Sequence, residues 1–153
     1  MKTKIIIQLA VLFIFLNVKA NGDHETKTKN TTKAAKAVAI SELTKNLEYD
    51  FDGPAVRNAY YEKLDQLAKA VIDGDYAVSL KGHADGIGAY KYNWVLSDTR
   101  AINVKKYLIS KGVKENRIIT TPFGSTLPIA SNKTATGRQK NRRVEIDLKK
   151  IAG

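Results

Sequence analysis

The hydrophobic pattern begins with an alternating segment and continues with a helical one. Apolar and polar side chains alternate over residues 47–51, as in a half-buried strand, and the turn sequence at residues 52–54 ends the alternation. From Ala55, apolar side chains recur at spacings of three and four residues, which predicts an amphipathic helix that ends near Gly74. The inner positions expected for this helix are Val56, Tyr60, Leu64, Leu67, Ala68 and Val71.

The middle of the chain repeats the alternation of strand and helix. Residues 76–80 predict a second strand, which leads into a glycine-rich loop at residues 82–88. Residues 93–111 predict a second helix, and Gly112 is its expected C-cap. The inner face expected for this helix carries Leu96, Ala101, Val104 and Leu108.

Two further strands complete the pattern. Residues 117–121 predict a third strand, and the alternating residues 144–148 predict a fourth. The segment 127–137 between them is rich in Pro, Ser, Asn and Thr, which predicts a loop. Strands that alternate with helices favour an α/β fold. We therefore expect one domain over residues 44–150: a two-layer βαβαββ sandwich, with a mixed sheet and helices on one face.

The N-terminal residues have the pattern of a secretory signal. Lys2 and Lys4 precede an apolar stretch at residues 5–16, and Ala20 offers the small side chain that a signal peptidase requires. The apolar stretch is shorter than the roughly 20 residues of a membrane-spanning helix. A cleaved signal peptide over residues 1–20 is therefore favoured over an uncleaved membrane anchor.

A strong positive charge accompanies the segment that follows. Residues 21–43 predict a flexible basic leader, although residues 34–43 also suit a short helix or the approach to the first strand. The formal charge of the chain is +11, and loss of residues 1–20 removes three lysines and no acids, which leaves +8. Such a charge indicates a polyanionic neighbour, either nucleic acid or an anionic cell-envelope surface.

The chain contains no cysteine, which excludes disulfides, thiolate metal sites, a catalytic thiol and N-terminal lipidation of the bacterial lipoprotein kind. After signal cleavage we therefore expect a protein of the periplasm or cell envelope, without a lipid anchor and without an integral membrane segment.

The patterns of common enzymes are missing from the sequence. The loop 82–88 is not followed by the Gly-Lys-Ser/Thr of a phosphate-binding loop. His24 and His83 are far apart and offer no metal-ligand spacing. Ser97 and Ser125 have no candidate base other than His83, for which a structural place at the sheet edge is expected. We therefore expect no catalytic activity, no cofactor and no metal.

Three polar side chains near the second helix predict a small-ligand pocket. Asn93 and Arg100 are seven residues apart and share one helix face, and the loop that carries Asp85 leads into that helix. A small zwitterion would fit, with Asp85 taking its ammonium and Arg100 its carboxylate. Each residue also has an ordinary alternative, Asp85 as a turn residue that accepts backbone N–H groups and Arg100 as a solvated helix residue.

The order of these residues resembles the OmpA-like C-terminal domain family, the peptidoglycan-anchoring module of Gram-negative envelopes. The resemblance rests on residues 82–88, 93–101 and 141–146, and Phe51 with Asp52 matches the aromatic and acidic pair after the family's first strand. It extends over residues 47–148. It implies a non-catalytic module that binds peptidoglycan and is associated with the outer membrane.

The resemblance also implies a ligand. In that family the loop aspartate and the helix arginine hold the two ends of the diaminopimelate side chain of the peptidoglycan stem peptide, and Asp85 and Arg100 fall on those positions. The ligand-binding residues implied in this way are Asp85, Arg100, Asn93, Leu96, Ala84, Gly86, Phe51, Asp52, Asn141 and Arg142.

Arg142 and Arg143 are successive residues next to the last predicted strand, so they point to opposite faces, and we expect Arg142 at the periphery of the pocket. The family usually has threonine where this chain has Ala84. The missing hydroxyl would otherwise bond the ligand's carboxylate, so we expect a lower affinity or an altered stem-peptide preference.

The rival interpretation is an exported basic protein that binds polyanions without a specific pocket. The lysines that would serve it are Lys27, Lys29, Lys33, Lys36 and Lys45. No helix-turn-helix or RNP-like aromatic motif accompanies them, so we expect no nucleic-acid partner. A cell-wall hydrolase, the third class considered, lacks a metal or nucleophile set. Salt distinguishes the specific pocket from the polyanion binder. Polyanion binding weakens steeply as the salt concentration rises, whereas binding in a pocket of paired charges weakens modestly.

Overall fold

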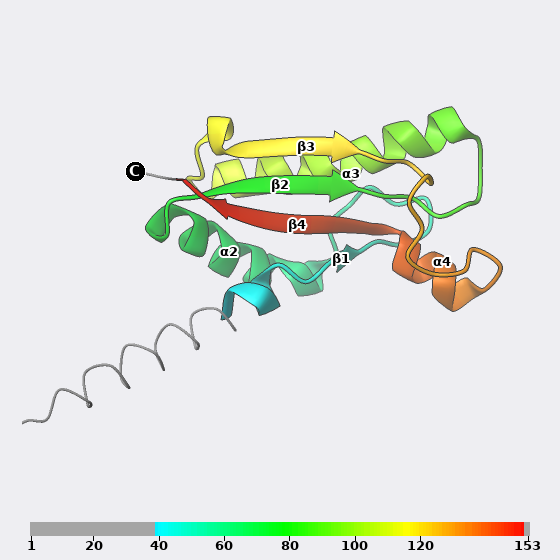
Figure 1. The fold of residues 1–153 in the computed structure, drawn as a ribbon, viewed down its shortest axis with the longest axis horizontal. Coiled ribbons are helices and arrows are strands. Elements are labelled where there is room, and N and C mark those ends of the chain that lie inside the picture. The colour runs from blue at the N-terminus through cyan, green and yellow to red at the C-terminus, as the bar shows by residue number, and fades with distance from the viewer. Residues whose placement is uncertain (1–38, 152–153) are drawn as a thin grey trace, which may run out of the picture. The chain divides into compact units, whose positions relative to one another are not determined.

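The computed structural model describes residues 39–151 (Figure 1). The signal peptide expected for residues 1–20 and most of the leader expected for residues 21–43 lie outside the described residues. Within residues 39–151, no helix combines the length and the apolar character that a bilayer crossing requires.

The sheet of the described part of the chain is mixed. Its strands are β1 (Leu47–Glu48), β2 (Tyr76–Gly82), β3 (Ile118–Pro122) and β4 (Arg143–Lys150). They lie in the order β1-β4-β2-β3, with β4 antiparallel to both β1 and β2, and β3 parallel to β2 (Figure 1). Val78 of β2 lies opposite Ile118 on one side and Leu148 on the other, which defines the register.

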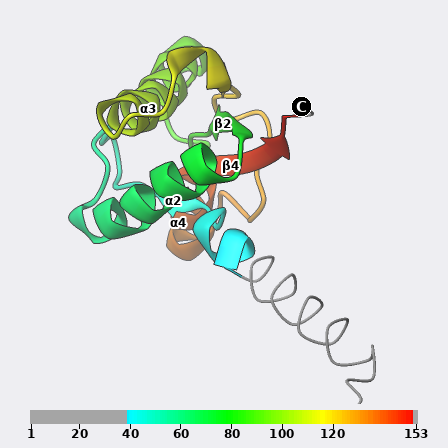
Figure 2. The ribbon, with the colours of Figure 1, turned by 90° about the vertical axis from the view of Figure 1, so that its left-hand side faces the viewer.

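Two long helices cover one face of this sheet. They are α2 (Tyr61–Asp73) and α3 (Tyr90–Ser110), and both lie on the same side of β2 and β4 (Figure 2). A shorter helix, α4 (Ala135–Asn141), precedes β4, and 3-10 turns occupy Asn58–Tyr60 and Glu115–Arg117. The predicted α/β fold with a mixed sheet and helices on one face is therefore confirmed.

The core lies between the sheet and the two long helices, because alternate strand residues and one stripe of each helix are apolar. Its buried side chains include Leu47, Leu64, Leu67, Val71, Val78, Leu80, Val104, Leu108, Val144 and Ile146. Gly82 brings α3 close to the end of β2, since a Cβ there would lie 1.9 Å from the carbonyl oxygen of Ser97. This close approach places the first turns of α3 beside the loop that follows β2.

The segment between β1 and α2 differs from the hydrophobic pattern. β1 ends at Glu48, earlier than predicted, and the chain then turns with a positive φ of 56° at Asp52. The helix expected from Ala55 begins only at Tyr61, because the backbone is extended at Arg57 with a ψ of 143°. The apolar spacing here belongs to an extended chain and a 3-10 turn.

The elements near the second helix differ in two ways. α3 begins at Tyr90, before its predicted start, and Gly112 follows it with a positive φ of 94°, as the C-cap prediction requires. The helix α4 was not predicted. Thr134 caps it by accepting the N–H of Gly137, and a Cβ on Gly137 would lie 2.0 Å from the carbonyl oxygen of Ser131. A cap and a close backbone approach therefore define α4, without a long apolar period.

The start of the described chain also contributes to the fold. Residues 39–43 are helical, which is one of the two alternatives left open by the sequence. Leu43 packs against the hydrophobic core. Packed structure therefore begins within the segment that was expected to be a leader.

Candidate functional site

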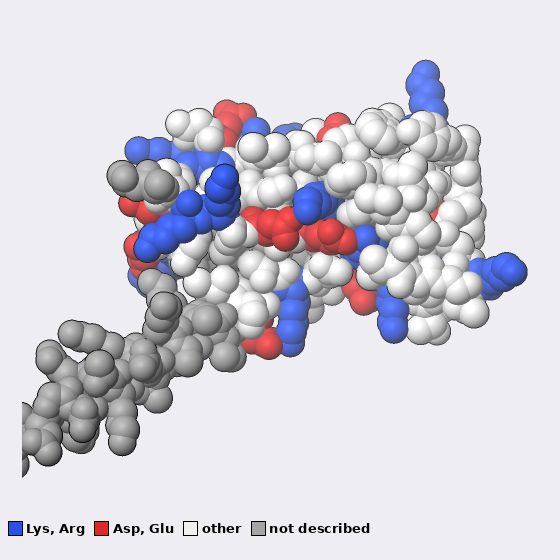
Figure 3. Space-filling model, in the orientation of Figure 1, with Lys and Arg blue, Asp and Glu red and all other residues white. Residues whose placement is uncertain are grey.

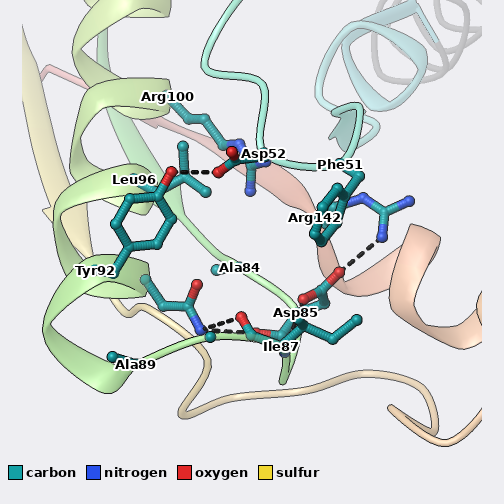
Figure 4. Close-up of a pocket in the computed structure, with 12 residues that line it drawn as sticks. Phe51, Asp52, Ala84, Asp85, Ile87, Ala89, Tyr92, Leu96, Arg100 and Arg142 are labelled. Atoms are coloured by element: carbon teal, nitrogen blue, oxygen red, sulfur yellow. Dashed lines mark hydrogen bonds and ion pairs between the residues drawn. The ribbon is translucent and has the colours of Figure 1, made fainter.

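A hollow of about 480 Å³ lies beside the first turns of α3 (Figure 4). It is built by the turn after β1, by the β2–α3 loop with the start of α3, and by the junction of α4 with β4. Its lining consists of Phe51, Asp52, Ala84, Asp85, Ile87, Gly88, Ala89, Tyr92, Asn93, Leu96, Arg100 and Arg142. The predicted site residues are all in this set except Gly86 and Asn141.

Asp85 lies on the loop after β2, and both of its carboxylate oxygens are occupied. Oδ1 accepts the N–H of Ile87 at 2.9 Å, and Oδ2 lies 2.7 Å from NH1 of Arg142. The side chain is only 4% exposed. The turn-residue alternative is thus correct in part, because one oxygen does hold the loop backbone. The other oxygen forms an ion pair that the sequence did not predict.

Arg100 is fully buried, so the alternative of a solvated helix residue is wrong. Its Nε, NH1 and NH2 donate to the backbone carbonyls of Gly53, His83 and Asp50, at 2.9, 3.0 and 3.0 Å. Its guanidinium carbon lies 5.1 Å from the centre of the Tyr49 ring. Three of the five N–H donors of the guanidinium are therefore used to hold the backbone, and two remain for other partners.

Burial, with a smaller contribution from the positive charge of Arg142, lowers the pKa of Arg100 to about 10. Tyr49, Asp85 and Asp52 act in the opposite direction. Because a pKa near 10 is still well above neutrality, Arg100 carries its charge at pH 7. The hollow therefore contains a fixed cation in a position that water barely reaches.

Arg142 lies in direct contact with Asp85, closer than the peripheral place expected from the sequence. Its Nε donates to the carbonyl oxygen of Tyr49 at 3.1 Å, its NH2 donates to Oε1 of Gln139 at 2.5 Å, and its side chain is 12% exposed. The next residue, Arg143, pairs with Glu145 at 2.5 Å and does not line the hollow. The expected separation of the two arginines is thus present.

Asn93 lies on the same side of α3 as Arg100 and fixes the loop. Its Nδ2 donates to the carbonyl oxygens of Asp85 and Ile87, at 3.2 and 2.9 Å. Ala84, which is 4% exposed, lies between this helix face and Asp85 (Figure 4). The helix therefore positions the acid through the loop backbone.

Gly86 and Asn141 act behind the hollow. Asn141 accepts the N–H groups of Ile129 and Ala130 at 2.9 and 3.0 Å, and donates to Oδ1 of Asn132 at 2.7 Å. The same oxygen of Asn132 accepts the N–H of Gly86 at 3.0 Å. These two predicted residues therefore brace the β2–α3 loop against the loop before α4, and neither lines the hollow.

The rim of the hollow is apolar and exposed. Phe51, Tyr92 and Ile87 line it while remaining 62%, 51% and 47% exposed. The hydroxyl of Tyr92 donates to Asp52, and this hydrogen bond raises the pKa of Tyr92. Sequence reasoning missed Ile87, Gly88, Ala89 and Tyr92. Tyr92 is four residues before Leu96 and therefore lies on the same face of α3. A prediction that began this helix at Tyr90 would have placed Tyr92 beside the hollow.

His83 lies behind the loop, directly after the inner strand β2, and is not the sheet-edge residue that was expected. It is 2% exposed, and within the described residues neither ring nitrogen has a hydrogen-bond partner. Its ring stacks on Phe123 with the centres 5.2 Å apart, and Nε2 lies 3.6 Å from Oε1 of Glu145. Burial, and then the charge of Arg143, lower the pKa of His83 to about 4. The imidazole is therefore neutral at pH 7.

The lining of the hollow combines two carboxylates, from Asp52 and Asp85, with two guanidiniums, from Arg100 and Arg142. Among residues 39–151 no group of three or more His, Cys, Asp and Glu side chains could hold a metal ion. Balanced charges beside an apolar rim suit a small ligand that carries both an ammonium and a carboxylate.

The sequence model of the OmpA family matches residues 48–142. Outer membrane protein A of Bordetella avium is 42% identical over 126 residues, which are 81% of this chain and 62% of that protein. Peptidoglycan-binding protein ArfA of Mycobacterium tuberculosis is 44% identical over 96 residues, which are 62% of this chain and 29% of that protein.

A solved structure shows the same fold. The crystal structure of the peptidoglycan-associated lipoprotein from Burkholderia pseudomallei has a TM-score of 0.66 and 25% sequence identity, over 68% of this chain and 89% of that one. The chain spans less than two thirds of the length of the two curated relatives described above. The likeness therefore concerns one domain of those proteins.

Proposed function

The chain belongs to the OmpA family, and we propose that it is a non-catalytic module of the cell envelope that binds peptidoglycan. The ligand group is the diaminopimelate side chain of the stem peptide, and the place of action is the periplasm. The names of two similar proteins, a peptidoglycan-binding protein and a peptidoglycan-associated lipoprotein, support this assignment.

The observation that carries the proposal is the joint presence of Asp85 and Arg100 in one hollow. The free end of diaminopimelate is a zwitterion with an ammonium and a carboxylate. Arg100 is held by backbone carbonyls and has two N–H donors left for the carboxylate. Asp85 supplies the opposite charge for the ammonium. The exposed rim around them leaves room for the rest of the peptide.

The residues considered for catalysis are engaged in structure. Ser97 donates its hydroxyl to the carbonyl oxygen of Trp94 at 2.8 Å and accepts the N–H of Gly124 at 2.9 Å. His83 is buried and neutral, and its nearest acid, Glu145, is paired with Arg143. These contacts favour binding without catalysis.

One face of the described residues disfavours the rival polyanion binder, whose Lys27, Lys29, Lys33 and Lys36 lie outside those residues. On the face drawn in Figure 3, acidic side chains lie between basic ones, and a wide uncharged area adjoins them. Two of the ion pairs in the structure join Lys81 to Asp147 and Arg143 to Glu145. A binder of polyanions would be expected to present a continuous basic surface.

The proposal is tested by sedimentation of the purified protein with peptidoglycan sacculi. Asp85→Asn and Arg100→Lys should each weaken binding by roughly ten-fold or more, as expected for a lost charge-assisted hydrogen bond. The matched control is Lys140→Gln, an exposed residue of α4 outside the hollow. Undiminished binding by both variants, shown to be folded, would refute the assignment of these residues.

Salt separates the two candidate functions in the same assay. Binding through one hollow should weaken only modestly between about 50 and 200 mM salt, whereas polyanion binding should fall by orders of magnitude. A steep fall, together with a loss for Lys140→Gln and undiminished binding for Asp85→Asn, would favour the polyanion binder, because Asp85→Asn removes a negative charge.

A further inference from the structure

The acid of the proposed site is not free in this structure. Both oxygens of Asp85 are engaged, one by the N–H of Ile87 at 2.9 Å and the other by Arg142 at 2.7 Å. Only 4% of its side chain is exposed. A ligand ammonium therefore meets a carboxylate that already has a cationic partner.

That cationic partner is held from three sides. Arg142 donates to Asp85, to the carbonyl oxygen of Tyr49 at 3.1 Å and to Gln139 at 2.5 Å. Two of these three contacts do not involve the acid. The guanidinium can therefore lose Asp85 and still keep two hydrogen-bond partners.

An ammonium beside Asp85 would also lie close to the guanidinium of Arg142, because the two groups seek the same oxygen. Like charges at contact distance repel, and the low exposure of the pair limits screening by water. The two cations therefore compete for the carboxylate. Arg100 does not compete in this way, since its bonds go to backbone carbonyls.

We propose that Arg142 is a specificity-determining residue that occupies Asp85 in the free protein and must be displaced by the ammonium of the ligand. This inference rests on the proposed function, because it concerns the same hollow and the same ligand group. It assigns to Arg142 a role opposite to that of a ligand-holding residue. Arg142 therefore lowers the affinity for a peptide with a free amine relative to the affinity for the same peptide with an acylated amine.

The reason lies in what each ligand does to the ion pair. A peptide with a free ammonium breaks the Asp85–Arg142 contact and replaces it with a contact between the ammonium and Asp85. A peptide whose amine is acylated carries no charge there and leaves the contact intact. Loss of Arg142 removes the competitor for the first peptide only. The ratio of the two affinities therefore reports on Arg142 directly.

The test uses calorimetric titration of the purified protein with a soluble stem peptide that ends in diaminopimelate, and with the same peptide acetylated on its free amine. In Arg142→Gln, the preference for the free amine over the acetylated peptide should rise roughly ten-fold relative to the wild type. Lys140→Gln removes the same charge from the same helix, outside the hollow, and should leave the preference unchanged.

A second variant keeps the charge of Arg142 and removes one of the two partners that Arg142 retains when it leaves Asp85. In Gln139→Ala the displacement of Arg142 should therefore cost more, and the preference for the free amine should fall. This variant tests the inference even if Arg142→Gln does not fold.

The outcomes separate this inference from the proposed function. If the wild type binds both peptides and the folded variants show the same preference as the wild type, the role of Arg142 is overturned and the proposed function stands. An equal loss of affinity for both peptides in Arg142→Gln also overturns the role of Arg142, because Arg142 would then hold the ligand. Absence of binding of either peptide to the wild type overturns the proposed function as well.

Discussion

The carboxylate of Asp85 lies 2.7 Å from the guanidinium of Arg142, and this ion pair joins two segments that are 57 residues apart in the chain. It connects the β2–α3 loop to the junction of α4 with β4. Because both side chains are largely buried, the pair contributes to the stability of the loop as well as to the charge of the hollow. The two contributions can be measured separately.

The first prediction concerns the stability of this pair. Asp85→Asn and Arg142→Gln should each lower the free energy of unfolding by about 1–3 kcal/mol, because each leaves a buried polar partner without its counter-charge. The double variant should lose less than the sum of the two, with a coupling of about 1 kcal/mol or more. Urea denaturation of the four proteins measures the coupling. Additive losses would mean that the pair contributes nothing to stability.

Arg100 should contribute to the stability of the fold as well as to binding. Arg100→Met removes the donor from three buried or half-buried carbonyl oxygens, those of Asp50, Gly53 and His83. Unsatisfied groups of this kind cost about 1–3 kcal/mol each. The free energy of unfolding should therefore fall by about 3 kcal/mol or more, measured by urea denaturation. Asn103→Ala, on the same helix, removes a single exposed bond to Pro54 and should cost less than about 1 kcal/mol.

His83 should make the stability depend on pH. Its pKa is about 4 in the folded protein and near 6.5 in an unfolded chain, so the unfolded state binds the proton more readily. The stability contributed by neutral His83 is present above pH 6.5 and is lost as the pH falls towards 4, by up to about 1.4 kcal/mol per pH unit. Denaturation curves of wild type and His83→Phe should diverge in this window. Parallel curves would show that His83 does not titrate differently in the two states.

Leu43 should contribute to the stability of the domain although it precedes β1. It is partly buried against the core, so Leu43→Ala should lower the free energy of unfolding by about 1–2 kcal/mol. The control is Glu42→Ala, which removes only an exposed ion pair with Lys45 and should change stability by less than about 0.5 kcal/mol. Equal effects of the two changes would place the start of the domain after residue 43.

Ala84 should set the affinity for the ligand without controlling the fold. It lines the hollow at the position where the resemblance to the OmpA-like family leads us to expect threonine. Ala84→Thr adds a hydroxyl near the expected place of the ligand's carboxylate, and one neutral hydrogen bond of about 0.5–1.5 kcal/mol would tighten stem-peptide binding several-fold. Calorimetric titration with the diaminopimelate peptide checks this. A weaker complex would mean that the hydroxyl crowds the hollow.

The sequence predicted the elements whose apolar period is long. The apolar stripes of α2 and α3 and the alternation of β4 predicted the two layers of the fold. Each of these elements buries one face, and that face appears in the sequence as a regular apolar period. α4 escaped prediction, since seven residues carry too short a period and its cap at Thr134 is a single local signal. The extended chain at Arg57, where the guanidinium pairs with Asp50, was not predicted either, because the apolar spacing alone does not show a break in the backbone.

The composition of the hollow was predicted better than its bonding. The spacing of Asn93 and Arg100 on one helix face and the resemblance at Asp85 brought the right residues together. The ion pair of Asp85 with Arg142 was not foreseen, because it depends on where α4 ends relative to the β2–α3 loop. The hydrogen bonds from Arg100 to backbone carbonyls were not predicted either, since a sequence does not show which carbonyls face a side chain.

The strand order has a consequence for the time at which the hollow forms. β4 is the last strand of the sheet in sequence, yet it lies between β1 and β2, and it is preceded directly by Arg142. Until β4 is in place, β1 has no strand neighbour and the β2–α3 loop lacks the cation that holds it. Contacts between such distant segments form late and slowly in folding. A chain emerging from the ribosome should therefore lack the hollow during most of its synthesis, and the hollow should form in one final step.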